Sequence, residues 1–268
     1  MISAVRAIVA AIIMVLTFAA PVAAGPLEDA IAAHNKRDYA TALQLYRPLA
    51  EQGVAVAQTN LGVLYANGLG VPKDFAEAAK WYRKAADQGQ PTAQSNLGSM
   101  YRNGEGVPQS DAEAMRLYRK AGERGHAGAQ FYLGLMYNKG SQAALKDDVE
   151  AMKWYRKAAD QGNASAQVNL GVMYADGDGV PQNDAEALKW YRLAAEQGHP
   201  NGQSNLGNMY RNGKGVPKDP VRAYMWFSLS AAKGNQFAVK NRDLVAVGMT
   251  PAQIAEAQKL ASEWKPTK

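Results

Sequence analysis

Hydrophobic and polar positions repeat along this chain with a period of 36 or 37 residues. The motif Asn-Leu-Gly-x-x-Tyr, with Tyr-Leu-Gly-x-x-Tyr in the third copy, occurs five times. Its last residues are Tyr65, Tyr101, Tyr137, Tyr174 and Tyr210. A fixed period of this length is typical of solenoids built from repeated helical units. The pattern therefore predicts one repeat array rather than separate compact domains.

The first half of each repeat is predicted to be an amphipathic helix. In the first copy Ala57, Leu61 and Tyr65 recur at helical spacing and share one face. Gly62 and its equivalents lie in the middle of this helix, where glycine costs about 1 kcal/mol relative to alanine. Because the glycine recurs in every copy, we expect another backbone to pass too close for a side chain.

The second half of each repeat is predicted to be another helix, reached through the turn Asn-Gly-x-Gly-Val-Pro. The glycines of this turn supply positive φ angles, and its proline stops the first helix. The second helix begins with a capping-box pattern, as in Asp74 with Glu77, and ends at a glycine such as Gly89. It carries an aromatic pair, Trp81 and Tyr82 in the first copy, which we expect in the core rather than in a ligand cage.

The ends of the array differ from its middle, as terminal capping units do. Residues 25–53 are predicted to form a capping helix pair without the glycine motif. Residues 54–234 hold the five repeats, and residues 235–268 are predicted to form a second capping pair. We therefore expect an all-α, right-handed α-solenoid of about seven antiparallel helix pairs.

Residues 1–24 have the layout of a secretory signal peptide. A basic start that includes Arg6 precedes an almost wholly apolar run over 7–20, and small residues follow. Cleavage is expected between Ala24 and Gly25, because the run is shorter than the roughly 20 residues that cross a bilayer. Retention of the leader as an anchor is the alternative. After cleavage we expect a periplasmic or secreted protein with no membrane span.

Composition excludes several kinds of chemistry. The chain has 268 residues, a formal net charge of +6 and no cysteine. Without cysteine there are no disulfides, cysteine-ligated zinc sites, iron–sulfur clusters or cysteine nucleophiles. No lysine or arginine run is dense enough to resemble a nucleic-acid-binding arm, so no nucleic acid partner is expected.

Candidate enzyme residues are few. No two of His34, His126 and His199 have a zinc-site spacing, so we expect helix-capping or solvated histidines and neither a metal nor a cofactor. Ser230 and Lys233 match the S-x-x-K tetrad of penicillin-binding enzymes, but the companion motifs Ser-Asp-Asn and Lys-Thr-Gly are absent. We predict no catalytic residue. An envelope hydrolase acting on β-lactams or peptidoglycan is the alternative.

The repeated motifs resemble Sel1-like repeats, which are relatives of the tetratricopeptide family. The resemblance rests on Ala-Gln-x-Asn-Leu-Gly-x-x-Tyr over 93–101 and on Asn-Gly-x-Gly-Val-Pro over 103–108. It is completed by Ala-x-x-Trp-Tyr-Arg-x-Ala-Ala-x-Gln-Gly over 78–89. It implies a non-enzymatic adaptor that binds proteins, often in the bacterial cell envelope. A secreted effector that binds host proteins is a further alternative.

Positions of the first helix that vary between repeats predict the binding surface. Thr59, Val63 and Ala66 lie opposite the inward face, and in the resembling family the first helices line a concave groove. Their equivalents form an apolar middle flanked by arginines in repeats two and five. We therefore expect a protein or peptide partner with an apolar centre and acidic groups near its ends. The candidate binding residues are Asn60, Asn96, Arg102, Phe131, Tyr132, Leu135, Asn169, Asn205 and Arg211.

Two features of this surface stay open at the level of sequence. The asparagines either bond an extended peptide backbone or only brace the helices of each repeat. Repeat three carries Phe131 and Tyr132 together with a turn over 140–146 that is one residue longer, so it is either the specific part of the surface or a neutral variant. We expect a monomer. The sequence does not identify the partner.

Overall fold

The computed structural model describes residues 24–267, and all its regular elements are helices. The predicted leader therefore lies almost wholly outside the described residues. The helices are α1 (Ala24–Asn35), α2 (Tyr39–Glu51), α3 (Ala55–Asn67), α4 (Phe75–Asp87), α5 (Pro91–Asn103), α6 (Asp111–Glu123), α7 (Ala127–Lys139), α8 (Asp148–Asp160), α9 (Ala164–Asp176), α10 (Asp184–Glu196), α11 (Pro200–Asn212), α12 (Pro220–Ala231), α13 (Gln236–Ala246) and α14 (Pro251–Glu263). None of these helices is long and apolar enough to cross a membrane.

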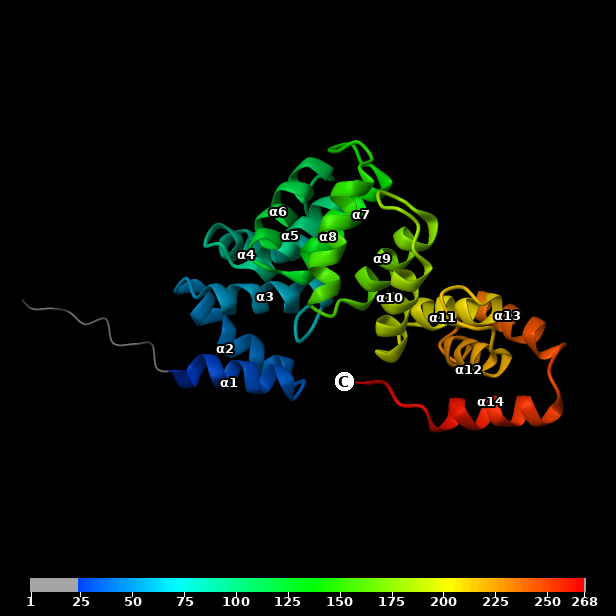
Figure 1. Cartoon of the computed structure of the whole chain (residues 1–268). Helices are drawn as coiled ribbons and strands as arrows, with labels where there is room; N and C mark the ends of the chain where they lie inside the picture. Colours follow the sequence, from blue (N-terminus) through cyan, green and yellow to red (C-terminus); the bar gives the residue numbers. More distant parts are fainter. Residues whose placement is uncertain (1–23, 268) are drawn as a thin grey trace, which may run out of the picture.

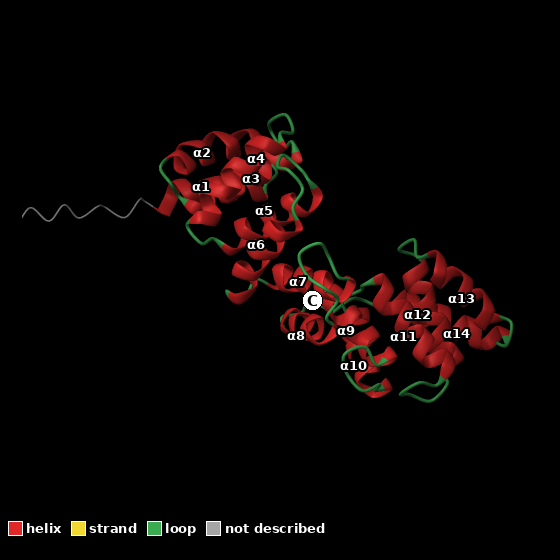
Figure 2. Ribbon diagram, turned by 90° about the horizontal axis from the view of Figure 1, so that it is seen from above, coloured by secondary structure: helices red, strands yellow, loops and turns green. Residues whose placement is uncertain are grey.

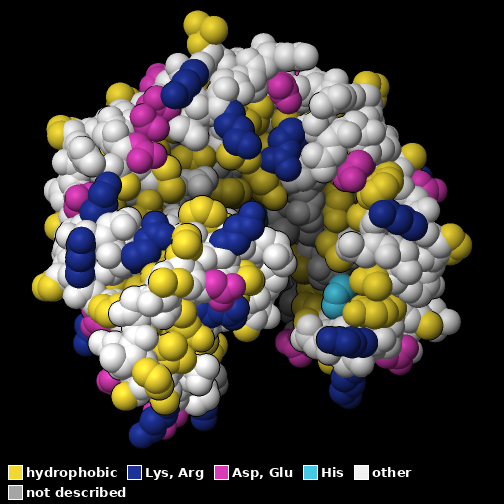
Figure 3. Space-filling view, turned by 90° about the vertical axis from the view of Figure 1, so that its right-hand side faces the viewer, with side chains coloured by type: hydrophobic (Ala, Val, Ile, Leu, Met, Phe, Trp, Pro, Cys, Tyr) yellow, Lys and Arg dark blue, Asp and Glu magenta, His cyan; other side chains and the backbone are white. Residues whose placement is uncertain are grey.

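The helices stack in chain order. From α1 to α13 each helix packs against the next, and α13 and α14 both pack against α12. The array curves, so that α1 and α14 lie at the two ends of an arch (Figures 1 and 2). Figure 3 shows one face of it, where two arms border a central hollow with apolar side chains on its wall. The expected all-α solenoid of about seven helix pairs is confirmed.

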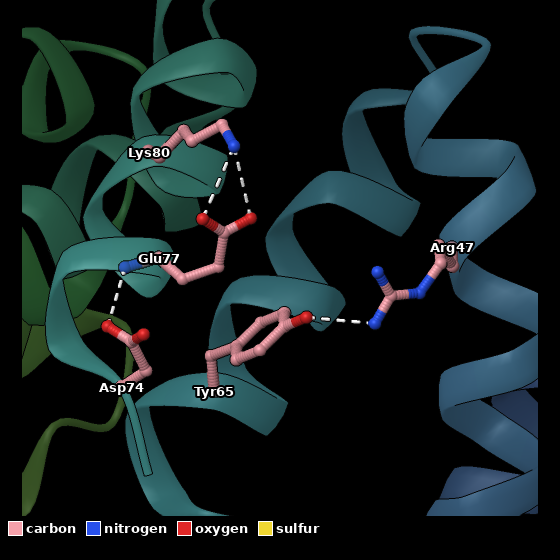
Figure 4. A network of polar contacts seen from close by, with 5 residues as sticks. All are labelled: Arg47, Tyr65, Asp74, Glu77 and Lys80. Carbon is pink, nitrogen blue, oxygen red and sulfur yellow. Dashed lines mark hydrogen bonds and ion pairs between the residues drawn. The ribbon is translucent and has the colours of Figure 1, made fainter. Parts of the chain in front are cut away.

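The second helices begin with side-chain caps, but the predicted capping box is only half formed. The Asp74 carboxylate accepts a 2.9 Å hydrogen bond from the Glu77 amide. The Asp74 amide donates instead to the Tyr65 carbonyl at 3.0 Å. The Glu77 carboxylate pairs with Lys80 at 3.3 Å (Figure 4). The reciprocal bond is missing because the carbonyl at the end of the first helix satisfies the cap amide.

The mid-helix glycines are explained by side chains. The expectation of a passing backbone was wrong except at Gly98, where a Cβ would also meet the Ala114 carbonyl oxygen at 3.3 Å. A Cβ on Gly62 would lie 2.6 Å from Cε1 of Tyr82, and one on Gly134 would lie 2.5 Å from Cδ1 of Tyr155. The tyrosine at this position in repeats one to four, and Phe227 in repeat five, therefore pack against the first helix of their own repeat. The tryptophan of each pair is also buried, as Trp81 at 5% exposure shows, which confirms the core interpretation.

Candidate functional site

Three hollows of similar size lie at equivalent places in the array. The first, about 300 Å³, is lined by Asn96 and Tyr82 among others. The second, about 280 Å³, is lined by Arg102 and Leu135. The third, about 300 Å³, is lined by Asn205, Arg211 and Tyr191. We call these three hollows the groove. Of the nine predicted residues, Asn96, Arg102, Leu135, Asn205 and Arg211 line it.

The second hollow is bordered by an aromatic cluster from repeats two and three. The guanidinium carbon of Arg102 lies 4.4 Å from the centroid of the Tyr132 ring. Tyr132 stacks on Tyr118 with centroids 5.1 Å apart, and Phe131 lies 5.3 Å from Tyr132. Burial raises the pKa of Tyr118 to about 12, so its hydroxyl is neutral at physiological pH. The structure thus brings Arg102, Leu135, Phe131 and Tyr132 together as one apolar and cationic surface.

The third hollow lies at the start of the C-terminal helices. Nη1 of Arg211 donates to Oδ1 of Asn241, a residue of α13. Phe237 of the same helix lines the hollow and is 58% exposed. Arg211 is therefore anchored through a neutral amide, which positions its guanidinium without neutralising the charge.

The asparagines differ in what they contact. Nδ2 of Asn60 donates to the Tyr46 hydroxyl at 3.1 Å, so this asparagine braces α3 against α2. Asn169 lies beside the Tyr155 hydroxyl, whose pKa is raised to about 12 by burial and lowered in part by this asparagine. Asn96 and Asn205 line the first and third hollows. Asn96 also lies beside a buried tyrosine hydroxyl, that of Tyr82. The bracing role thus describes Asn60, Asn96 and Asn169, and of these three only Asn96 also lines a hollow.

One of the varied positions faces away from the groove in every repeat but the third, where it holds the half-buried Phe131. Thr59 is 3% exposed, and its equivalents Ser95, Val168 and Ser204 are also buried. The expectation that these side chains point into a groove was wrong. Each first helix packs between two second helices, as α3 does between α2 and α4, so much of its circumference is covered.

Two sets of hydrogen bonds that recur between repeats were not predicted from the sequence. Nη2 of Arg47 donates to the Tyr65 hydroxyl at 2.9 Å, joining the second helix of one unit to the first helix of the next (Figure 4). The equivalent pairs are Arg83 with Tyr101, Arg119 with Tyr137 and Arg156 with Tyr174. Buried glutamines such as Gln58 bond across the same joints, with Nε2 donating to the Ala50 carbonyl at 3.0 Å. The signal was the constant 18-residue spacing between arginine and tyrosine.

The enzyme-like residues have structural partners. Ser230 is fully buried, and its Oγ donates to the Pro200 carbonyl at 2.7 Å. Nζ of Lys233 bonds the Gly198 carbonyl. The Ser230 bond lies within repeat five, the Lys233 bond reaches back to repeat four, and the buried Ser230 hydroxyl is not free to act as a nucleophile.

The histidines of the inter-repeat corners are helix caps. Nδ1 of His126 accepts from the Ala129 amide at 3.1 Å, and Nδ1 of His199 accepts from the Gly202 amide at 3.4 Å. The capping role predicted for these two histidines is confirmed. Within residues 24–267 no group of three His, Asp or Glu side chains is placed to hold a metal ion.

Comparisons with known proteins agree with this architecture. The model of the Sel1 repeat family matches residues 36–54, 55–90, 91–126, 127–163, 164–199 and 200–235. A crystal structure of a Sel1 repeat protein from Oxalobacter formigenes is 33% identical, has a TM-score of 0.77 and covers 91% of this chain and 98% of its own. An immunity protein from Pseudomonas aeruginosa shares the fold at 23% identity and a TM-score of 0.50, covering 85% of this chain and 86% of its own. No curated protein matches the chain.

Proposed function

The chain belongs to the Sel1 repeat family, and on that premise we propose that it is a non-enzymatic scaffold that holds a peptide or protein segment in the groove. The observation that carries the proposal is the spacing of the three hollows at equivalent places of the array. An extended segment that crosses several repeats meets such a row in turn. Repeat solenoids use extended surfaces of this kind to bind partners.

The side chains around the hollows favour a segment with an apolar centre and acidic ends. Leu135 and the Tyr132 cluster supply apolar area near the middle of the array. Arg102 forms no ion pair with any residue of 24–267, and its nearest polar bond is a long one of 3.5 Å to Asn103. Arg211 keeps its charge as well. A guanidinium with no carboxylate partner is well suited to receive one from a ligand.

The predicted leader supports a periplasmic or extracellular setting for this scaffold. Cell fractionation with antibody detection tests it: we expect the mature protein in the periplasmic or extracellular fraction, cut between Ala24 and Gly25. Recovery of an intact chain in the membrane fraction would favour an uncleaved anchor. We propose a monomer, for which the molar mass from light scattering is the check.

The binding role is tested by affinity capture from an envelope extract. The protein is immobilised beside the double variant Arg102→Glu/Arg211→Glu, and bound species are identified by mass spectrometry. We expect a protein held by the wild type and lost by the variant, because reversing both charges repels an acidic ligand.

A charge-matched control separates the groove from net charge. Lys36 and Lys259 are exposed and lie outside the three hollows. The variant Lys36→Glu/Lys259→Glu changes the formal charge by the same amount and should retain the partner. Equal capture by wild type and by the Arg102/Arg211 variant would refute the assignment of the groove.

A further inference from the structure

Repeat two has a cavity where the other repeats have an indole. The cavity is about 460 Å³ and lies between α4, α5 and α6. Its apolar floor consists of Ala86, Leu97 and Leu117. Leu117 stands at the position that holds tryptophan in the other four repeats, namely Trp81, Trp154, Trp190 and Trp226. The smaller side chain leaves space at this joint of the solenoid.

Repeat three shows where the missing indole would lie. A Cβ built on Gly122 would approach Cζ3 of Trp154 to 3.3 Å. Gly122 is the equivalent of Ala86, which lines the cavity of repeat two. The indole of repeat three therefore occupies the place that is open one repeat earlier. The volume lies in the range of sites that bind small molecules or side chains.

A second departure from the repeat pattern leaves a buried acceptor without a donor. In repeat one Nε2 of Gln88 donates to Oε1 of the buried Gln58 at 2.8 Å. The equivalent pairs are Gln161 with Gln130 and Gln197 with Gln167. Repeat two has Arg124 at this position, and its Nη1 donates to the Gly89 carbonyl at 2.5 Å instead.

Oε1 of Gln94 consequently has no hydrogen-bond partner within the described part of the chain. Gln94 is 4% exposed and lines the cavity. A buried acceptor left unpaired costs about 1–3 kcal/mol. A ligand with an N–H group in the cavity would supply the missing donor.

The rim of the cavity is cationic. Four basic and two acidic side chains line it: Arg83, Arg116, Lys120, Arg124, Asp87 and Glu123. Arg83 donates to the Tyr101 hydroxyl at 3.0 Å, and Arg116 pairs with Glu113 at 2.7 Å. Lys120 and Arg124 form no ion pair with other residues of the described chain. These two charges favour an anionic group beside the apolar floor.

The chain itself shows what the equivalent surface of repeat five accepts. Its C-terminal tail, residues 264–267, lies across that surface. Trp264 packs edge-on against Trp226 with ring centroids 6.0 Å apart. The Thr267 amide donates to the Glu196 carbonyl at 2.9 Å. Glu196 is the equivalent of Asp87 on the rim of the repeat-two cavity. A joint of this kind therefore holds an extended segment through an aromatic ring and a backbone bond.

We propose that the cavity of repeat two binds an extended peptide segment that carries an aromatic side chain next to an acidic residue. The ring fills the volume left by Leu117, the carboxylate meets Lys120 and Arg124, and an N–H of the segment donates to Gln94. The proposal goes beyond the groove, because no residue that lines this cavity lines any of the three hollows. The proposal for this cavity and the proposal for the groove can therefore be refuted separately.

The test uses a labelled peptide that follows residues 263–267, with glutamate in place of Lys265. Fluorescence anisotropy follows fluoresceinyl-Glu-Trp-Glu-Pro-Thr-amide on the purified protein. We expect saturable binding, and at least tenfold weaker binding when the tryptophan is alanine or when both glutamates are lysines. Unlabelled indole-3-acetate is added as a competitor that displaces the labelled peptide. If it binds as tightly as the peptide, the site takes a small aromatic carboxylate and the peptide proposal is overturned.

Two variants of the cavity decide whether the peptide binds there. Leu117→Trp restores the residue of the other repeats, so it should keep or raise the melting temperature while weakening the peptide at least tenfold. Lys120→Glu changes an exposed side chain and should also weaken it at least tenfold. The groove variant Arg102→Glu/Arg211→Glu should bind the peptide unchanged. No binding to wild type, or equal binding to Leu117→Trp, would overturn the proposal.

Discussion

Substitution of alanine for a mid-helix glycine tests the close contact between the two helices of a repeat. We choose Gly134→Ala, because a Cβ there would lie 2.5 Å from Cδ1 and 2.7 Å from Cε1 of Tyr155. Carbon atoms in good contact lie about 3.5–4.0 Å apart, so the ring has to withdraw by roughly 1 Å. Tyr155 is fully buried, which leaves the ring little room.

The expected effect is the difference of two opposing contributions. Alanine favours a helix over glycine by about 1 kcal/mol. Forcing an extra methyl group into a well-packed core costs about 1–3 kcal/mol, and this site belongs at the upper end because the contact falls on a fixed ring. We expect the free energy of unfolding to fall by about 1–2 kcal/mol.

Urea unfolding followed by circular dichroism measures this change. Gly128→Ala in the same helix is the matched control, since its Cβ would approach only the His126 ring, at 3.1 Å. It should lower the free energy of unfolding less than Gly134→Ala does, because the half-buried His126 ring can move aside more easily than the fully buried Tyr155 ring. If Gly134→Ala lowers the unfolding midpoint no more than Gly128→Ala does, the tyrosine contact does not explain the repeated glycine.

Two further predictions concern polar side chains near the helix ends of the array. Ser230→Ala removes the bond to the Pro200 carbonyl and should lower the free energy of unfolding by about 1 kcal/mol, with no effect on partner capture; loss of capture at unchanged stability would contradict its structural role. Burial lowers the pKa of His126 and of His199, the latter also through Lys233, below the ordinary 6.5. The stability that these two neutral histidines contribute is therefore fully present above about pH 6.5. It is lost as the pH drops below that value, since the unfolded chain then binds more protons than the folded chain. Urea midpoints from pH 8 to pH 5 check this, and His126→Asn/His199→Asn, which installs the cap residue of α9, should reduce the slope.

The repeat architecture was predictable because the same motifs recur in five copies along the sequence. The tyrosine motif and the closing glycine agree from copy to copy, and the turn glycines agree in every repeat but the third. Gly68 and Gly89 adopt the expected positive φ angles. The cap side chains were predictable for the same reason. The missing half of the capping box was not, since it depends on the Tyr65 carbonyl from another helix.

The site was less predictable because it depends on contacts between repeats. Arg102 and Tyr132 belong to neighbouring repeats, and helical spacing within one helix does not show that they touch. Burial of Thr59 likewise follows from packing on both sides of α3. The cavity of repeat two had a visible signal in Leu117, but its meaning required knowing which surface the indole of Trp154 covers.

The tail also bears on the order in which the molecule folds. Helices that pack on their neighbours in sequence form local contacts, so folding can begin at any repeat and spread along the array. The bond from Thr267 to Glu196 instead joins residues 71 positions apart. Such a contact forms only after the helices between have ordered. Folding of the C-terminal end should therefore finish with a slower step that chains lacking residues 264–267 do not show.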